Sequence, residues 1–263
     1  MKSLSMKIAS PSFSAAFMAG AICFVLFAPI ALNAQQNKPW EKIPIPKLHD
    51  FKPQQPKRIE LKNGIVLFLQ EDHELPFVSG SVLIPGGSRD EDPAKVGLVG
   101  LYGQAWRTSG TAKLDGDQLD NLLEAKAAHI ETEGGEDSTA LAWDSLKGDA
   151  DQVFALALDL LLHPKFNPEK LELAQQQAAT AIVRRNDDES EIAERESAKL
   201  VYGANSPYTR QPELSTIGRV TVDDLKSWHD RTIGGKLIVG ISGDFDPVAM
   251  EAKLRAALRV CHR

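Results

Sequence analysis

The sequence predicts an α+β domain with two layers, in which helices pack on one face of a mainly antiparallel β-sheet. The first observation behind this prediction is that strand-type runs come in pairs. The pairs turn at Asn63-Gly64 and at Gly134-Gly135, which are typical residues of tight hairpins. The second observation is that helical segments follow the strand pairs in groups, which favours an α+β arrangement over a parallel sheet with single crossover helices.

The strand-type segments are short, and they alternate apolar with polar residues or are apolar throughout. They are residues 58–72 (two strands), 76–88, 129–146 (two strands) and 236–245. The helical segments repeat apolar residues every three or four positions. They are residues 96–108, 115–128, 149–164, 167–188, 189–203, 221–232 and 246–258. Asn167 (followed by Pro168) and Thr221 are typical N-cap residues, so two of these helices have well-marked starts.

The N-terminal part of the chain differs from the rest. Residues 1–34 begin with two lysines, continue as a short apolar run and end at the small residue Ala34, which predicts a secretory signal peptide and export to the periplasm or the medium. If this segment is retained, it is instead a membrane anchor. Residues 35–57 contain five prolines and are predicted to form an extended linker. Residues 58–263 are then a single domain.

Composition and charge exclude several classes of function. The chain has 43% hydrophobic residues and a net charge of −6 without a basic stripe, so it is a folded protein with no electrostatic basis for binding nucleic acid. It has no phosphate-loop or dinucleotide-binding glycine pattern. Its six histidines never occur three or four positions apart, so no helix presents a pair of them to a metal ion.

A series of short motifs identifies a resemblance. Along the chain they are Asn63-Gly64, Gly87-Ser88, Glu91, Gly97-Leu98-Val99 and Gly110-Thr111. In this order and spacing they resemble the opening of the pitrilysin/insulinase family of zinc peptidases with an inverted zinc motif. The resemblance extends over residues 58–258, and it implies the two-layer fold and the first of the two domain copies that such chains usually carry.

The resemblance also implies where the zinc site of active members would lie. The two zinc-binding histidines of the family motif correspond to Gly100 and Gln104, and the glutamate that acts as general base corresponds to Gly103. The third ligand, a glutamate on a later helix, corresponds to Thr180 or Ala181. None of these residues is a histidine or a carboxylate, so we expect no catalytic residues, no bound zinc and no other cofactor.

One other set of possible metal ligands is present. His129, Glu131 and Glu133 alternate along a strand and would share one face of it. A polar face on an exposed strand is the commoner reason for such a pattern, but the alternative function, a zinc-dependent endopeptidase with an unrecognised metal site, depends on a set of this kind. His229, beside Trp228 on an amphipathic helix, is expected to be structural.

The resemblance implies a function for a member without the motif. In paired family members a non-catalytic half completes the chamber and helps to hold the peptide, and we expect this chain to be such a partner or scaffold subunit. The expected partner is a subunit that bears the zinc motif, or a further copy of this chain. The strand that would receive a peptide as an added strand is formed by His129, Ile130, Glu131, Thr132 and Glu133.

Overall fold

The computed structural model describes residues 43–260. The predicted signal peptide, residues 1–34, and the first part of the predicted linker lie outside this range. The chain divides into two units, one up to Pro53 and one from Gln54 onwards. Residues 43–53 have no regular secondary structure. Within the described range we find no helix with the length and apolar character needed to cross a membrane.

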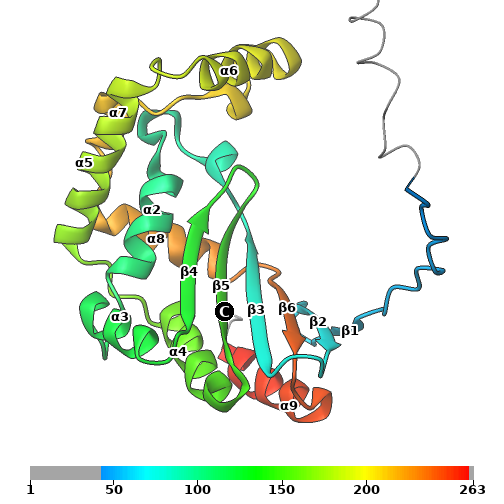
Figure 1. Cartoon of the computed structure of the whole chain (residues 1–263). Helices are drawn as coiled ribbons and strands as arrows, with labels where there is room; N and C mark the ends of the chain where they lie inside the picture. Colours follow the sequence, from blue (N-terminus) through cyan, green and yellow to red (C-terminus); the bar gives the residue numbers. More distant parts are fainter. Residues whose placement is uncertain (1–42, 261–263) are drawn as a thin grey trace, which may run out of the picture. The chain divides into compact units, whose positions relative to one another are not determined.

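A six-stranded mixed sheet forms one layer of the second unit (Figure 1). Its strands are β1 (Lys57–Glu60), β2 (Val66–Glu71), β3 (Phe77–Pro85), β4 (His129–Gly134), β5 (Ser138–Leu146) and β6 (Ile238–Gly243). Their order across the sheet is β1-β2-β6-β3-β5-β4, so β1 and β4 are the edge strands. Only the β2–β6 pair is parallel. The prediction of a mainly antiparallel sheet is therefore confirmed.

The helices follow the sequence pattern closely. They are α2 (Leu98–Thr108), α3 (Gly116–Glu124), α4 (Ala150–Leu162), α5 (Pro168–Arg184), α6 (Glu189–Tyr202), α7 (Leu214–Ile217), α8 (Val222–Ile233) and α9 (Pro247–Ala257). The Asn167 side chain accepts a hydrogen bond from the Glu169 amide, and the Thr221 side chain accepts one from the Asp224 amide. Both predicted N-caps are therefore present. The short α7 lies in a segment where the sequence predicted no helix.

Alternating burial along the central strands shows which face of the sheet the helices cover. Val82 and Ile84 of β3 are buried, whereas Leu83 between them is 41% exposed. On β5, Leu141 and Trp143 are buried in the same way. Helices α2, α4 and α8 contact strands β4, β5 and β3, respectively (Figure 1). The core therefore lies between one face of the sheet and these helices, and α2, the helix of the candidate site, lies against the edge strand β4.

Candidate functional site

The start of α2 is fixed by a buried carboxylate. The Glu91 side chain is only 4% exposed and accepts hydrogen bonds from the amides of Gly97 (3.0 Å) and Val99 (2.6 Å). Burial raises the pKa of Glu91, and these two amide hydrogen bonds partly counteract that rise. Gly97 has φ of 103°, a left-handed conformation that favours glycine. The N-cap residue of α2, Gly97, has no side chain, and the Glu91 carboxylate caps the helix in its place.

Replacing Glu91 with alanine is expected to lower the free energy of unfolding by about 1–2 kcal/mol, because two helix-terminal amides lose their acceptor. Urea denaturation of the purified protein measures this change. Glu136→Ala is the matched control, since Glu136 is exposed and its side chain makes no hydrogen bond among the described residues. Equal stability of the two variants would show that Glu91 does not hold the helix start.

The inner face of α2 packs into an aromatic cluster. Trp106 donates a hydrogen bond from Nε1 to the Leu160 carbonyl (2.9 Å), and the Tyr102 hydroxyl lies 2.9 Å from Nδ1 of His229. Phe166 packs against both Tyr102 and His229. Burial lowers the pKa of His229 to about 4, so this ring is neutral at neutral pH. His229 is therefore part of the core, as predicted.

The family resemblance places the zinc motif at three positions of α2, namely Gly100, Gly103 and Gln104. Gly100 and Gln104 are exposed, and a Cβ atom built at Gly100 would have no atom from outside its own helix neighbourhood within 4 Å. Gly103 is buried. The first and last motif positions therefore have room for side chains, whereas the middle position, where the family has its general base, does not face open space.

Strand β4 occupies the space beside Gly103. A Cβ atom at Gly103 would lie 2.5 Å from the amide nitrogen of Gly134, closer than a Cβ atom approaches a backbone nitrogen. In return, a Cβ atom at Gly134 would overlap the carbonyl oxygen of Val99. The Thr132 hydroxyl donates a hydrogen bond to the Gly103 carbonyl (2.6 Å). Two glycines thus allow the helix and the strand to touch, and this contact replaces the glutamate of the motif.

Arg107 joins α2 to the free edge of the sheet. Its Nε donates a hydrogen bond to the Ile130 carbonyl (2.6 Å), and its guanidinium also pairs with Asp120 of α3. Because Gly135 bonds back toward β5, the carbonyl and amide groups of Ile130, Thr132 and Gly134 point away from β5. Within residues 43–260, the Arg107 contact is the one hydrogen bond to this outward row of backbone groups. The groups of Thr132 remain free.

The third ligand position lies on the exposed side of α5. Thr180 and Ala181 are both exposed, and the Thr180 hydroxyl donates a hydrogen bond to the Gln176 carbonyl of its own helix (3.0 Å). Ala181 borders a groove of about 490 Å³ between α5, α6 and the β4–β5 turn. Neither residue presents an anionic oxygen to this groove.

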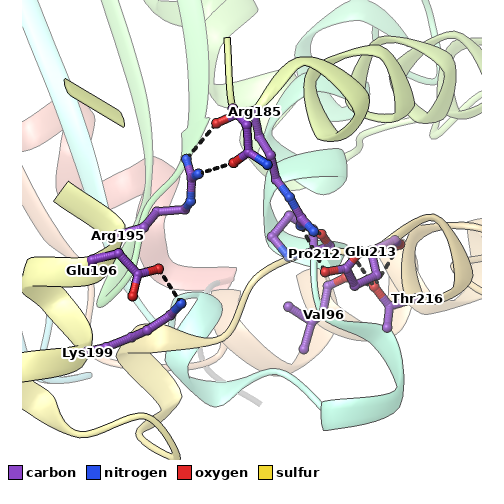
Figure 2. A network of polar contacts seen from close by, with 9 residues as sticks. Val96, Arg185, Arg195, Glu196, Lys199, Pro212, Glu213 and Thr216 are labelled. Carbon is purple, nitrogen blue, oxygen red and sulfur yellow. Dashed lines mark hydrogen bonds and ion pairs between the residues drawn. The ribbon is translucent and has the colours of Figure 1, made fainter. Parts of the chain in front are cut away.

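Beside that groove, Arg195 links α6 to the end of α5, and Arg185 links the end of α5 to the segment before α7. Figure 2 shows Arg195 of α6 directed to the end of α5, where it donates hydrogen bonds to the Arg185 carbonyl (2.8 Å) and to Oδ1 of Asn186 (2.6 Å). Arg185 in turn pairs with Glu213 (2.8 Å). Both guanidinium groups are therefore engaged within the chain and serve to position the helices.

The residues present do not fit a zinc ion. Two of the motif positions are glycines with no donor atom, Gln104 offers a neutral amide, and the close contact at Gly103 leaves no room for a base. The alternative set is not assembled either, since His129 pairs with Asp144 of β5 (3.0 Å), which raises the pKa of His129. Across residues 43–260, no three His, Cys, Asp or Glu side chains are grouped as metal ligands.

Comparison with known proteins agrees with the geometry. A family model described as insulinase (peptidase family M16) matches residues 66–205, which is more than half of the chain. The chain belongs to the insulinase family. A curated M16 relative is the non-peptidase homologue YmxG of Helicobacter pylori, 25% identical over 183 residues that cover 68% of this chain and 42% of YmxG.

Solved structures of M16 proteins share the fold. The inactive peptidase M16 domain from Pseudomonas fluorescens superimposes with a TM-score of 0.71 at 19% identity, over 79% of this chain and 50% of that one. The first half of the periplasmic protease PqqL from Escherichia coli gives 0.68 at 17% identity, over 79% and 47%. The chain thus spans about half the length of these relatives. Together with the replaced motif, these relatives support a non-catalytic M16 domain.

Sequence reasoning missed two features of the contact between α2 and β4. It ended the edge strand at Gly134, as the structure does, but it did not predict that Gly134 contacts α2. It did not single out Arg107. The available signal was that Arg107 lies one helical turn after Gly103 and Gln104 and therefore shares their face.

Proposed function

We propose that this chain is an exported, non-catalytic M16 subunit that binds an extended peptide segment along the edge strand β4 and works beside a partner of its own family. The observation that carries the proposal is the state of that edge. The motif helix α2 is held against β4 by Gly103 and Thr132, while the outward amide and carbonyl of Thr132 have no partner among the described residues. Such groups can pair with an added strand.

Several findings support the finer parts of this proposal. The signal-peptide pattern of residues 1–34 and the periplasmic relative PqqL support export. The relatives are about twice as long as this chain, which supports a partner of the same fold, either a zinc-motif subunit or a further copy. Binding by backbone pairing needs no metal, so the loss of the zinc motif does not remove it.

Thr132→Pro is expected to weaken peptide binding at least tenfold, because proline removes the free outward amide of the strand. The measurement is fluorescence anisotropy with a pool of labelled, proline-free decapeptides. Thr132→Val is the matched control, since both variants lose the hydrogen bond to Gly103 and only the proline variant loses the amide. Unchanged binding by the proline variant, or no binding by the parent protein, would contradict the proposal.

Metal content tests the alternative, a peptidase with an unrecognised metal site. We expect the purified protein to contain no stoichiometric zinc and to cleave none of the pooled peptides. Stoichiometric zinc together with cleavage that a chelator abolishes would overturn the non-catalytic function.

A further inference from the structure

We propose that the N-terminal arm, residues 43–53, of one copy of the chain adds as a strand to β4 of a second copy, so that two copies exchange arms. This inference rests on the proposed function of β4 as a strand receptor and names the segment that β4 receives. Four features support the exchange of arms: the backbone pattern of the arm, its exposed apolar side chains, the charges of the two sheet edges and the point where the arm is attached.

The first five residues of the arm can donate backbone hydrogen bonds on one side only. They are Ile43-Pro44-Ile45-Pro46-Lys47. In an extended strand, successive residues direct their amides to opposite sides, so the amides of Ile43, Ile45 and Lys47 share one side. The other side has prolines, which lack an amide. A strand of this kind is suited to the edge of a sheet, where one side is paired and the other is not.

The arm's apolar side chains are exposed in the single chain. The exposed fractions are 65% for Ile43, 91% for Ile45, 85% for Leu48 and 88% for Phe51. Four large apolar residues within nine positions of an otherwise proline- and lysine-rich segment are unusual for a linker that only spaces two domains. They provide the apolar contact that an added strand needs in addition to its backbone hydrogen bonds.

Charge distinguishes between the two edges of the sheet. Edge strand β1 has only four residues, and its Lys57 and Arg58 are paired with Glu251 and Glu60. Edge strand β4 has six residues, and its exposed Glu131 and Glu133 form no ion pair among the described residues. The arm is basic, with three lysines to one aspartate over residues 42–53. Charge therefore attracts the arm to β4, whose carboxylates are unpaired, and gives it no comparable attraction to β1.

The pairing places apolar side chains where the zinc motif has been lost. Directly paired residues of antiparallel strands have their side chains on the same face of a sheet. The side chains of residues that pair with the outward groups of Thr132 would therefore lie on the α2 side of the sheet. In an antiparallel pairing of Ile45 with Thr132, the side chain of Ile45 would then lie beside α2, where Gly100 has open space next to it.

The arm's point of attachment favours exchange between two copies. Gln54, where the second unit begins, donates a hydrogen bond to the Glu71 carbonyl at the end of β2. The second unit thus begins beside the end of β2, about 20 Å from β4 at a spacing of about 4.8 Å per strand. When two copies exchange arms about one two-fold axis, β4 of each copy receives the arm of the other. The prolines of the arm stop a further strand from adding. The assembly therefore closes at two copies.

Sedimentation of the full chain tests the proposal. We expect a concentration-dependent dimer that is weakened at least tenfold by Ile45→Pro/Pro46→Ile. This exchange of two neighbours keeps length, charge and composition but places a proline on each side of the arm. Pro44→Ala/Pro46→Ala is the matched control, because it keeps the amides of Ile43 and Ile45 and is expected to dimerise. Thr132→Pro on the receiving strand is expected to weaken the dimer as well.

The outcomes separate this inference from the proposed function. If Thr132→Pro abolishes binding of the pooled peptides but the dimer is absent or unaffected by the arm variants, β4 binds peptides and the arm proposal is overturned. If the pooled peptides do not bind and no dimer forms, both proposals fail. A monomer whose arm amides are nevertheless protected from hydrogen exchange would indicate closure within one chain and would overturn the exchange.

Discussion

Replacing Gly103 with alanine is expected to destabilise the domain by about 2 kcal/mol, whereas the same change at Gly100 is expected to stabilise it by about 0.5–1 kcal/mol. Both replacements raise the helix propensity of α2. At Gly103 the added methyl group would lie 2.5 Å from the Gly134 amide and 3.0 Å from the Glu133 carbonyl carbon. Backbone atoms of a paired strand cannot yield as a flexible side chain can, so the overpacking cost dominates.

Urea denaturation gives the free energy of unfolding of each variant relative to the parent protein, and we expect changes of opposite sign. The Gly100 variant is a matched control, since it changes the same residue type on the same helix at a position with open space. A Gly103→Ala protein as stable as the parent would show that α2 and β4 are not held in contact through these glycines.

The same contact predicts that the motif cannot be restored by three substitutions. Gly100→His/Gly103→Glu/Gln104→His places the motif residues on α2, but the glutamate has no space and Thr180 and Ala181 supply no third ligand. We expect this triple variant to lose stability and to gain no stoichiometric zinc, as measured by metal analysis after dialysis. Gly100→His/Gln104→His lacks the crowded glutamate and is expected to keep the parent's stability.

Acidification from pH 7 to pH 5 is expected to remove about 2 kcal/mol of stability through His229. The pKa of this histidine is about 4 in the folded protein, below its ordinary value of about 6.5 in the unfolded chain. Between pH 6.5 and pH 4, His229 is protonated in the unfolded chain but neutral in the folded protein. The stability that neutral His229 contributes is therefore complete above pH 6.5 and is lost as the pH falls toward 4. The slope is about 1.4 kcal/mol per pH unit.

The double variant Tyr102→Phe/His229→Phe tests this slope. It removes both partners of a buried polar contact and keeps rings of similar size in the cluster, so no unpaired hydroxyl remains. Urea denaturation at pH 7 and pH 5 is expected to show a smaller acid loss in the variant than in the parent protein. His129→Gln, which removes an exposed histidine, is the control and is not expected to reduce the acid loss. Equal acid losses in the double variant and the parent would rule out His229 as the source.

Local patterns in the sequence determined the elements and the loss of the zinc motif. Asn63-Gly64 predicted the turn between β1 and β2, and Asn167 and Thr221 predicted two helix starts, because turns and caps depend on residues close in the chain. Short runs that alternate apolar with polar residues or are apolar throughout predicted the positions of the strands. The family resemblance placed Gly100, Gly103 and Gln104 at the motif positions, and none of these residues is a histidine or a carboxylate.

Tertiary structure decided what occupies the site and which edge is free. Nothing in the local pattern shows that β6 pairs with both β2 and β3, strands that precede it by more than 150 residues. The contact of Gly103 with Gly134 and the hydrogen bond from Arg107 to Ile130 depend equally on how α2 lies on the sheet. The spacing of apolar residues indicates whether a residue is buried. Which residues it contacts depends on how the whole domain packs, because interiors are close-packed and leave little space between elements.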